Sequence, residues 1–307
     1  MLYLSTRNKA DSFTAYRVLH SDTAPDGGIF MPMQLPVQSD ADLATFAQMN
    51  FGEAAAAVLN LFFGTKLSGW DVDFAVGRQA VDLVSIGHKV YIAESWHNPA
   101  GTQTYLAQRL YDLVTNQKNS AQVPNLWFQT VVNIAVLFSA YGKCCRRRIY
   151  KLDIAVESGD LMLLLAVRYA KKMGLPIREI ILGCTDQDSF WDFLSYGDYA
   201  VGRKDWNAGL EALLWLEFGY GEAACYLTAL ENKSIYRLKT YPLEQLRKGL
   251  FVTVVGESRV KNVAESSPAY RMEPGTARAF AAVQDYRAKT GENKDTLLFA
   301  RNTPEKE

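Results

Sequence analysis

Two kinds of apolar pattern alternate along the chain. Short apolar runs bounded by turn-forming residues are typical of buried strands, whereas apolar residues that recur every three or four positions are typical of helices. The short runs predict strands near 89–94, 152–156, 178–183, 250–255 and 296–300. The periodic runs predict helices within 39–64 and near 71–86, 105–114, 125–141, 161–173, 207–218 and 273–286. This alternation predicts an α/β fold, in which a mostly parallel sheet is flanked by helices on both faces.

One predicted helix contains the longest apolar run of the chain, residues 126–141. The run is interrupted by Gln129 and Asn133 and is shorter than the roughly 20 apolar residues that cross a bilayer. We therefore expect a buried helix and no membrane association. The following segment, 143–148, reads Lys-Cys-Cys-Arg-Arg-Arg. It is either an anion or partner site or, as we favour, a solvated loop whose cations suit the C-terminal dipole of the helix.

The composition is that of a globular protein without a strongly charged partner. Of 307 residues, 49% are hydrophobic and 21% are charged, as in soluble domains. The 33 basic and 33 acidic residues cancel, so no net field attracts nucleic acid. The N-terminus lacks the pattern of a signal peptide. The 4 cysteines show neither a disulfide framework nor a metal-ligand spacing, which predicts a reducing cytoplasm and no metal site.

Candidate chemistry lies in the turns that follow the predicted strands, where α/β proteins commonly place ligand groups. These residues are His97, Asn98, Pro99 and Thr104 after the first strand, Ser158, Gly159 and Asp160 after the second, and Asp188 after the third. Asn302, after the last strand, is added only by the resemblance described below. Backbone amides that are free at the start of a helix attract anions, which makes 157–160 a candidate anion site. Asp188 has a simpler role as the cap of a helix that starts at 189.

Three segments resemble threonine synthases. Residues 24–32, Ala-Pro-Asp-Gly-Gly-Ile-Phe-Met-Pro, are nearly identical to an element at the N-terminus of that family. Trp96, His97 and Pro99 match the family's Phe-His-Gly-Pro-Thr-x-Ala-Phe-Lys-Asp element, and residues 170–176 are also similar to the family. The resemblance implies the type II fold of pyridoxal phosphate enzymes, as in the tryptophan synthase β subunit. It also implies a mostly helical N-terminal part over 1–88 and a large α/β domain over 89–307.

The sequence departs from the family where the family holds its cofactor. Thr104 replaces the lysine that forms the Schiff base, and a hydroxyl cannot form an imine with an aldehyde. The family's Pro-Ser/Thr-Gly-Asn-Phe-Gly loop reads Glu-Ser-Gly-Asp-Leu-Met at 157–162, which adds two carboxylates beside a phosphate site and repels it. Asp188 is the one position kept from the family's Thr-Asn-x-Asn-Asp element. Gly275 and Asn302 stand where the family has histidines.

A whole domain of the family is also expected to be missing. In threonine synthases, a small α/β domain with a Thr-Ser-Gly-Asp-Thr-Gly loop lies between the lysine and the element that corresponds to Asn125. Thr104 and Asn125 are 21 positions apart in this chain. Residues 115–124 have the length of an ordinary loop. We therefore expect the small domain to be deleted near 115–124.

The leading hypothesis is a threonine synthase-like pseudoenzyme. It would be a binding, structural or regulatory protein that needs no pyridoxal phosphate, and the nine turn residues named above would be vestiges of a cofactor site. Family members often pair through the large domain, and the loss of a domain exposes apolar surface. We therefore expect a homodimer or another protein partner.

Two alternatives stay open. In the first, Glu94, His97, Thr104, Asp160 and Asp188 form the polar cluster of an active enzyme, a lyase in the family's sense or one of another kind, with His97 as a base near neutral pH. Retention of His97 for packing is the simpler account. In the second, the old crevice binds a small molecule or an anion. An open cavity favours an enzyme or a binder, whereas a crevice filled by side chains favours an interaction protein.

Overall fold

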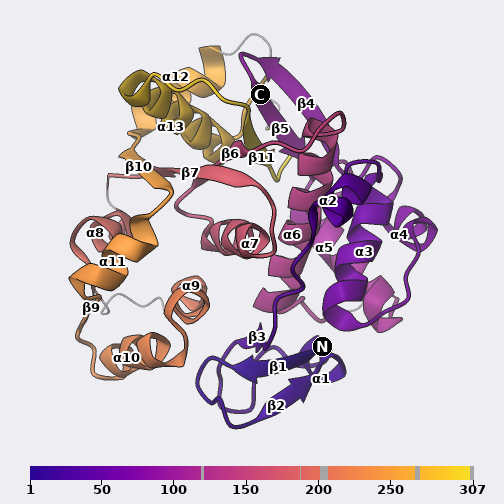
Figure 1. Cartoon of the computed structure of the whole chain (residues 1–307), viewed down its shortest axis with the longest axis vertical. Helices are drawn as coiled ribbons and strands as arrows, with labels where there is room; N and C mark the ends of the chain where they lie inside the picture. Colours follow the sequence, from indigo (N-terminus) through magenta and orange to yellow (C-terminus); the bar gives the residue numbers. More distant parts are fainter. Residues whose placement is uncertain (119–120, 187, 201–206, 267–269, 305–307) are drawn as a thin grey trace.

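A six-stranded sheet forms the centre of the computed structural model, which describes all residues except 119–120, 187, 201–206, 267–269 and 305–307 (Figure 1). Its strands are β4 (Asp82–Gly87), β5 (Val90–Glu94), β6 (Leu152–Glu157), β7 (Ile177–Cys184), β10 (Leu250–Val254) and β11 (Thr296–Ala300). Their order is β10-β7-β6-β11-β5-β4. All are parallel to their neighbours except β4, which is antiparallel to β5. The prediction of one largely parallel sheet is therefore confirmed.

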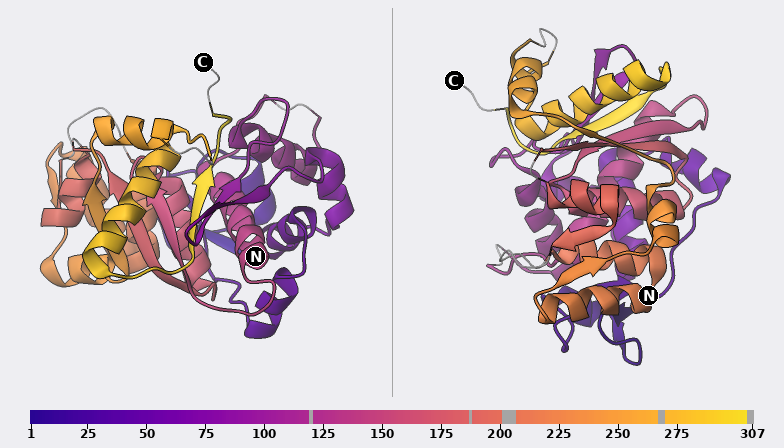
Figure 2. Two further views of the ribbon diagram at one scale, coloured as in Figure 1. Left: turned by 90° about the horizontal axis from the view of Figure 1, so that it is seen from above. Right: turned by 90° about the vertical axis from the view of Figure 1, so that its left-hand side faces the viewer.

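Helices cover both faces of this sheet. The face formed by residues such as Val90, Ile181 and Leu298 packs against α13 (Pro274–Thr290), with α12 (Glu257–Ser266) beside it. The opposite face packs against α6 (Leu126–Cys144) and α7 (Leu161–Lys172), and Figures 1 and 2 show the two layers on either side of the strands. All five residues of β11 are buried. Burial from both sides explains why such strands are continuous apolar runs.

Helix α6 is the central helix of the larger apolar core. Of its 19 residues, 15 are buried, as expected for a helix that is apolar on every side. Trp127 at its start is only 1% exposed and makes edge-to-face contacts with Tyr3, Phe62 and Tyr169. In the described part of the chain, no helix is both long and apolar enough to span a membrane.

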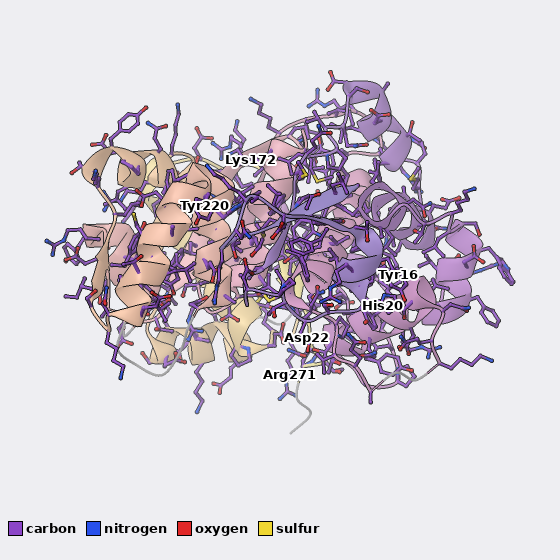
Figure 3. All side chains as sticks on the ribbon, turned by 90° about the horizontal axis from the view of Figure 1, so that it is seen from below. Tyr16, His20, Asp22, Lys172, Tyr220 and Arg271 are labelled. Atoms are coloured by element: carbon purple, nitrogen blue, oxygen red, sulfur yellow. The ribbon has the colours of Figure 1, made fainter. Side chains whose placement is uncertain are left out.

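The N-terminal part contains more strand than expected. Its helices are α1 (Ala15–Leu19), α2 (Asp40–Phe46), α3 (Phe51–Phe63) and α4 (Gly69–Val76), and its strands β1 (Leu2–Ser5), β2 (Ser12–Thr14) and β3 (Phe30–Pro32) form a separate antiparallel sheet. On the surface of α1, the rings of Tyr16 and His20 are stacked with centroids 4.2 Å apart (Figure 3).

The helix predicted over 71–86 is wrong in its second half. Helix α4 ends before Gly77, whose φ of 90° is a conformation that favours glycine. Residues 82–87 then form β4, because pairing with β5 stabilises them as an edge strand. The turn between the two strands has His88 and Lys89 at φ 50° and 59°, as a two-residue hairpin requires. The expected domain boundary after residue 88 falls inside this hairpin.

A smaller lobe lies between β7 and β10, on the left and at the bottom of Figure 1. It consists of α8 (Ser189–Tyr196), β8 (Asp198–Ala200), α9 (Ala208–Phe218), α10 (Tyr220–Glu231), β9 (Ile235–Arg237) and α11 (Thr240–Arg247). The sequence predicted α9 and a helix that starts at residue 189, which is α8. It did not predict α10 and α11 in this lobe, nor α12 after it. On the other side of the molecule, α5 (Gln103–Thr115) is joined to α6 by residues 116–125, of which 119–120 are outside the described residues.

Replacement of Trp127 by alanine should lower the free energy of unfolding by about 3–5 kcal/mol, the usual cost of removing a fully buried aromatic ring. Tyr241, which is 71% exposed, provides the matched control, and its replacement by alanine should change the free energy by less than about 0.5 kcal/mol. Urea unfolding followed by far-ultraviolet circular dichroism measures both. Similar losses for the two variants would contradict the position of Trp127 in the core.

Candidate functional site

The turns at the carboxyl ends of β5, β6 and β11 bring most of the predicted site residues to one edge of the sheet. These three strands are neighbours in the order β6-β11-β5 and run in the same direction. The turns that leave them therefore meet above the same edge, the usual place of a ligand site in a parallel sheet. We call the space between these turns the crevice.

The turn after β5 is held by its own polar side chains. Asn98 donates from Nδ2 to the carbonyl of Thr102 at 2.8 Å and accepts from the amide of Thr102 at 3.3 Å. Thr102 in turn caps α5 by accepting from the amide of Tyr105. Pro99 is exposed. Asn98 therefore shapes the turn, and its side-chain groups are used within it.

His97 belongs to a closed group of side chains beside this turn. Its Nε2 lies 2.6 Å from Oε2 of Glu94, and its ring is stacked on Trp96 with centroids 4.1 Å apart. The hydroxyl of Tyr270 donates to the other oxygen of Glu94 at 2.6 Å. Burial, and then the hydrogen bond to Glu94, raises the pKa of Tyr270 well above its usual value. Both oxygens of the buried Glu94 are thus occupied by neighbouring side chains.

A chain of polar contacts crosses the crevice from α6 to α7. Gln103, which is buried at the start of α5, donates to Asn133 of α6 and accepts from the hydroxyl of Ser95 at 2.9 Å. Nε of Arg301 donates to the same Gln103 oxygen at 2.9 Å, and its Nη1 forms an ion pair with Asp160. The side chain of Arg301 therefore joins the turns after β5, β6 and β11 directly.

A second ion pair lies beside the first. Arg278 of α13 pairs with Glu157 at 3.3 Å and also with Glu257. Burial raises the pKa of Glu157, and the charge of Arg278 acts in the opposite direction. Gly275 leaves room for this carboxylate, because a Cβ there would lie 2.4 Å from Oε1 of Glu157. The absence of a side chain at 275 and the presence of a glutamate at 157 are thus spatially coupled.

The amides at the start of three helices are already capped by side chains of the chain itself. Asp160 accepts from the amide of Leu163 in α7, and Asp188 accepts from that of Phe190 in α8. Asn207 caps α9 in the same way. Asp188 also accepts a hydrogen bond from the hydroxyl of Ser158. Carboxylates therefore occupy donors that would otherwise attract an anion.

Two cavities remain open around Gly159. The first, of about 410 Å³, is lined by Gln103, Thr104, Glu157, Gly159, Asp160, Glu273, Pro274, Gly275, Arg301 and Asn302. The second, of about 450 Å³, is lined by Leu126, Ser158, Gly159, Asp160, Leu161, Met162, Asp188, Ser189, Phe190, Asn207, Ala208 and Gly209. The first lining has three carboxylates and one cation, and the second has two carboxylates and no cation among the described residues. No described lysine lines either cavity.

The structure brings the predicted residues together in two sets and leaves a third set apart. Thr104, Gly159, Asp160 and Asn302 share the first cavity, and Ser158, Gly159, Asp160 and Asp188 share the second. His97, Asn98 and Pro99 line neither. The cluster of Glu94, His97, Thr104, Asp160 and Asp188 proposed for an active enzyme is therefore divided between separate surroundings. Within the described ranges, no group of three or more His, Cys, Asp or Glu side chains is arranged to hold a metal.

Four charged or polar residues of the crevice were not predicted. They are Gln103, Glu273, Arg278 and Arg301. Glu273 accepts from the side chain of Asn302 at 2.9 Å and from the amide of Arg301 at 2.8 Å. Arg301 immediately follows β11, so its position at the end of a predicted strand was the one available signal. The partners of Arg278 lie far away in the sequence, and no spacing pattern connects them.

Comparisons with known proteins agree with this architecture. The family model described as Threonine synthase N terminus matches residues 2–77. Threonine synthase-like 2 of Homo sapiens is 30% identical over 106 residues, which cover 32% of this chain and 22% of the human protein. The matched segment is therefore less than a quarter of the length of that relative.

Solved structures of threonine synthases share the fold. The pyridoxal phosphate-bound enzyme of Brucella melitensis has a TM-score of 0.83 and 16% identity, with 99% of this chain and 89% of that chain covered. The yeast enzyme has a TM-score of 0.83 and 15% identity, with 99% and 87% covered. The match at the N-terminus and the human relative thus link part of the sequence to threonine synthases, and the solved structures show that the whole chain shares the fold of those enzymes.

Proposed function

We propose that this chain is a non-catalytic member of its family, with a binding, structural or regulatory role. The observation that carries the proposal is the surrounding of Thr104. This residue is exposed in the first cavity of the crevice, where the family pattern has its lysine, and the lining around it contains Glu157, Asp160 and Glu273. An imine to an aldehyde cofactor needs an amine, and no described residue of either cavity supplies one.

The residues of the crevice do not fit pyridoxal phosphate. A phosphate group needs several aimed donors, and at the starts of α7 and α8 one amide each already donates to a carboxylate, that of Asp160 or Asp188. The carboxylates that line both cavities repel an anion further. We therefore propose that no cofactor is used, and that the nine turn residues are vestiges of a cofactor site.

The connection between α5 and α6 supports the proposed loss of the small domain. Helix α5 ends at Thr115 and α6 begins at Leu126, so residues 116–125 have the length of a loop. We retain the division into 1–88 and 89–307 as a proposal, with the deletion near 115–124. The four cysteines are free, as expected in the cytoplasm, where we place the protein.

A second candidate function is a small-molecule binder that uses the crevice. The two open cavities of about 410 and 450 Å³ favour it, since ligand sites commonly have such volumes. Their carboxylates favour a cationic ligand, such as an amine, over the anion that a family lyase would handle. An active enzyme with His97 as its base is less well supported, because His97 lies outside both cavities and bonds to Glu94.

Purified protein mixed with pyridoxal phosphate should form no stoichiometric imine, because Thr104 has no amine and the cavity lining repels the phosphate. Reduction with borohydride followed by intact-protein mass spectrometry measures the labelled fraction. A threonine synthase with its lysine intact is the positive control. Weak labelling at several exposed lysines is expected, as in most proteins. One-to-one labelling at a single buried lysine would contradict the proposal.

Replacement of Thr104 by lysine should not produce activity on O-phosphohomoserine, the family's substrate. Nearby carboxylates favour the charged ammonium and raise the pKa of the new lysine, whereas imine formation needs the neutral amine. The missing positioning of the cofactor is worth roughly 7–11 kcal/mol, which one side chain does not replace. Phosphate release is compared with that of Thr104→Gln, which has a side chain of similar length and no amine. Turnover by Thr104→Lys clearly above this control would require the pseudoenzyme proposal to be withdrawn.

The protein should self-associate, because the loss of a domain leaves apolar surface to be covered. The most exposed apolar pair is Trp70 and Phe74 of α4, which are 67% and 80% exposed and stacked with ring centroids 5.4 Å apart. Size-exclusion chromatography with light scattering should show a dimer in the micromolar range. Serine at both positions should weaken the dimer, whereas Tyr241→Ser, on another exposed ring, should not. A monomer at all micromolar concentrations would refute the expectation.

A further inference from the structure

A large basic cavity lies at the edge of the sheet opposite the crevice, where the parallel strands begin. Lys89, Lys151 and Lys294 lie just before β5, β6 and β11, which are neighbours in the sheet. Lys143 is in the last turn of α6, and arginines 146–148 follow that helix. All seven cations line one cavity of about 760 Å³. The fold therefore gathers residues from three distant parts of the sequence into one site.

The charge of this cavity is not typical of the chain. Basic and acidic residues are equal in number over the whole sequence, whereas the cavity lining contains seven cations and one carboxylate, Asp295. The hydroxyl of Tyr150 is hydrogen-bonded to Asp295, and burial followed by this bond raises the pKa of Tyr150 far above its usual value. So many like charges repel one another unless an anion lies between them.

Within the described ranges, the chain neutralises fewer than half of these cations. Nζ of Lys143 lies 3.7 Å from a carboxylate oxygen of Asp82, and Nζ of Lys294 lies 3.9 Å from one of Glu292. The ammonium group of Lys89 donates to the backbone carbonyl of Asn293. Arginines 146–148 and Lys151 form no ion pair with any described residue. The guanidinium of Arg148 lies over the ring of Tyr150, 5.9 Å from its centroid, which keeps the charge at the cavity wall.

The dipole of α6 does not account for this arrangement. The C-terminus of a helix is equivalent to about half a negative charge, and its effect is confined to the last turn. Lys143 lies in that turn, where its positive charge compensates the partial negative charge of the helix end. The cations contributed by the segments before β5, β6 and β11 have no relation to the end of α6. Our expectation of a solvated loop at 143–148 covers Lys143 and the exposed arginines 146–148. It does not explain why Lys89, Lys151 and Lys294 from other segments line the same cavity.

We propose that this cavity binds a small polyanion that carries two or more phosphate groups. Its volume is within the range of ligand sites, roughly 300–1,000 Å³. The planar guanidinium groups of arginines 146–148 match the oxygens of phosphate, and the surrounding lysines add point charges. Cys144 also lines the cavity, but burial raises the pKa of its thiol to about 12, so the binding is non-covalent. The site is separate from the crevice and does not depend on the function proposed above.

Isothermal titration calorimetry with inorganic tripolyphosphate and with ATP tests this site on the full chain. Both probes should bind one-to-one, and inorganic phosphate should bind much more weakly because it engages fewer cations. Simultaneous replacement of Arg146, Arg147 and Arg148 by glutamine should weaken tripolyphosphate binding by about 10- to 100-fold, the effect of losing charged hydrogen bonds. The matched control replaces Arg17, Lys66 and Lys239, which are exposed elsewhere, and should bind within about twofold of the unmodified protein.

A second variant, which should bind more tightly, tests the site even if the triple arginine variant does not fold. Asp295→Asn removes the one carboxylate of the cavity lining and should tighten tripolyphosphate binding by several-fold. Equal affinity of the arginine variant and the control, or no binding of either probe, would overturn the proposal. Tight binding of a single-stranded RNA that tripolyphosphate fails to displace would also overturn it in favour of a nucleic-acid surface. None of these results bears on Thr104 or on the crevice.

Discussion

The ion pair between Arg301 and Asp160 and the hydrogen bond from Arg301 to Gln103 link the segments that follow β5, β6 and β11 at the carboxyl edge of the sheet. These three residues come from the segments that follow β11, β6 and β5, which are far apart in the sequence. Gln103 is buried and extends the chain of contacts to Asn133 in α6. Removal of one partner from such a network leaves a charge without its counterpart, which usually costs more than the pair contributes. These polar side chains of the crevice are thus engaged in contacts with one another, which we call bracing.

Capping and bracing together place carboxylates at the edge of the crevice. Asp160 takes part in both, since it caps α7 and pairs with Arg301. Asp188 caps α8 and accepts from Ser158. Each carboxylate is consistent with local stability, because acidic side chains favour the start of a helix. The same charges oppose a phosphate at that place, so under the function proposed above local stability and cofactor binding conflict at these residues.

The sequence predicted the sheet and the turns well, because both depend on local patterns. Every expected strand is present, and Ser158, Gly159 and Asp160 do line cavities at the end of β6. Strand β4 was taken for helix, since its pairing with β5 is a tertiary effect that a window of sequence does not contain. The separation of His97 from Thr104 was also beyond prediction. Residues 98–102 form a turn between them, and the direction of a turn is set by contacts such as those of Asn98.

Gly275 has a consequence for which substitutions the crevice tolerates. The family pattern has a histidine there, yet a Cβ at 275 would meet the carboxylate of Glu157 at 2.4 Å. That carboxylate is held by Arg278, so a side chain at 275 would push against one partner of an ion pair. Substitutions at contacting positions are not additive. A side chain at 275 therefore requires that the carboxylate of Glu157 moves or that residue 157 is replaced, so the two positions are expected to change together rather than independently.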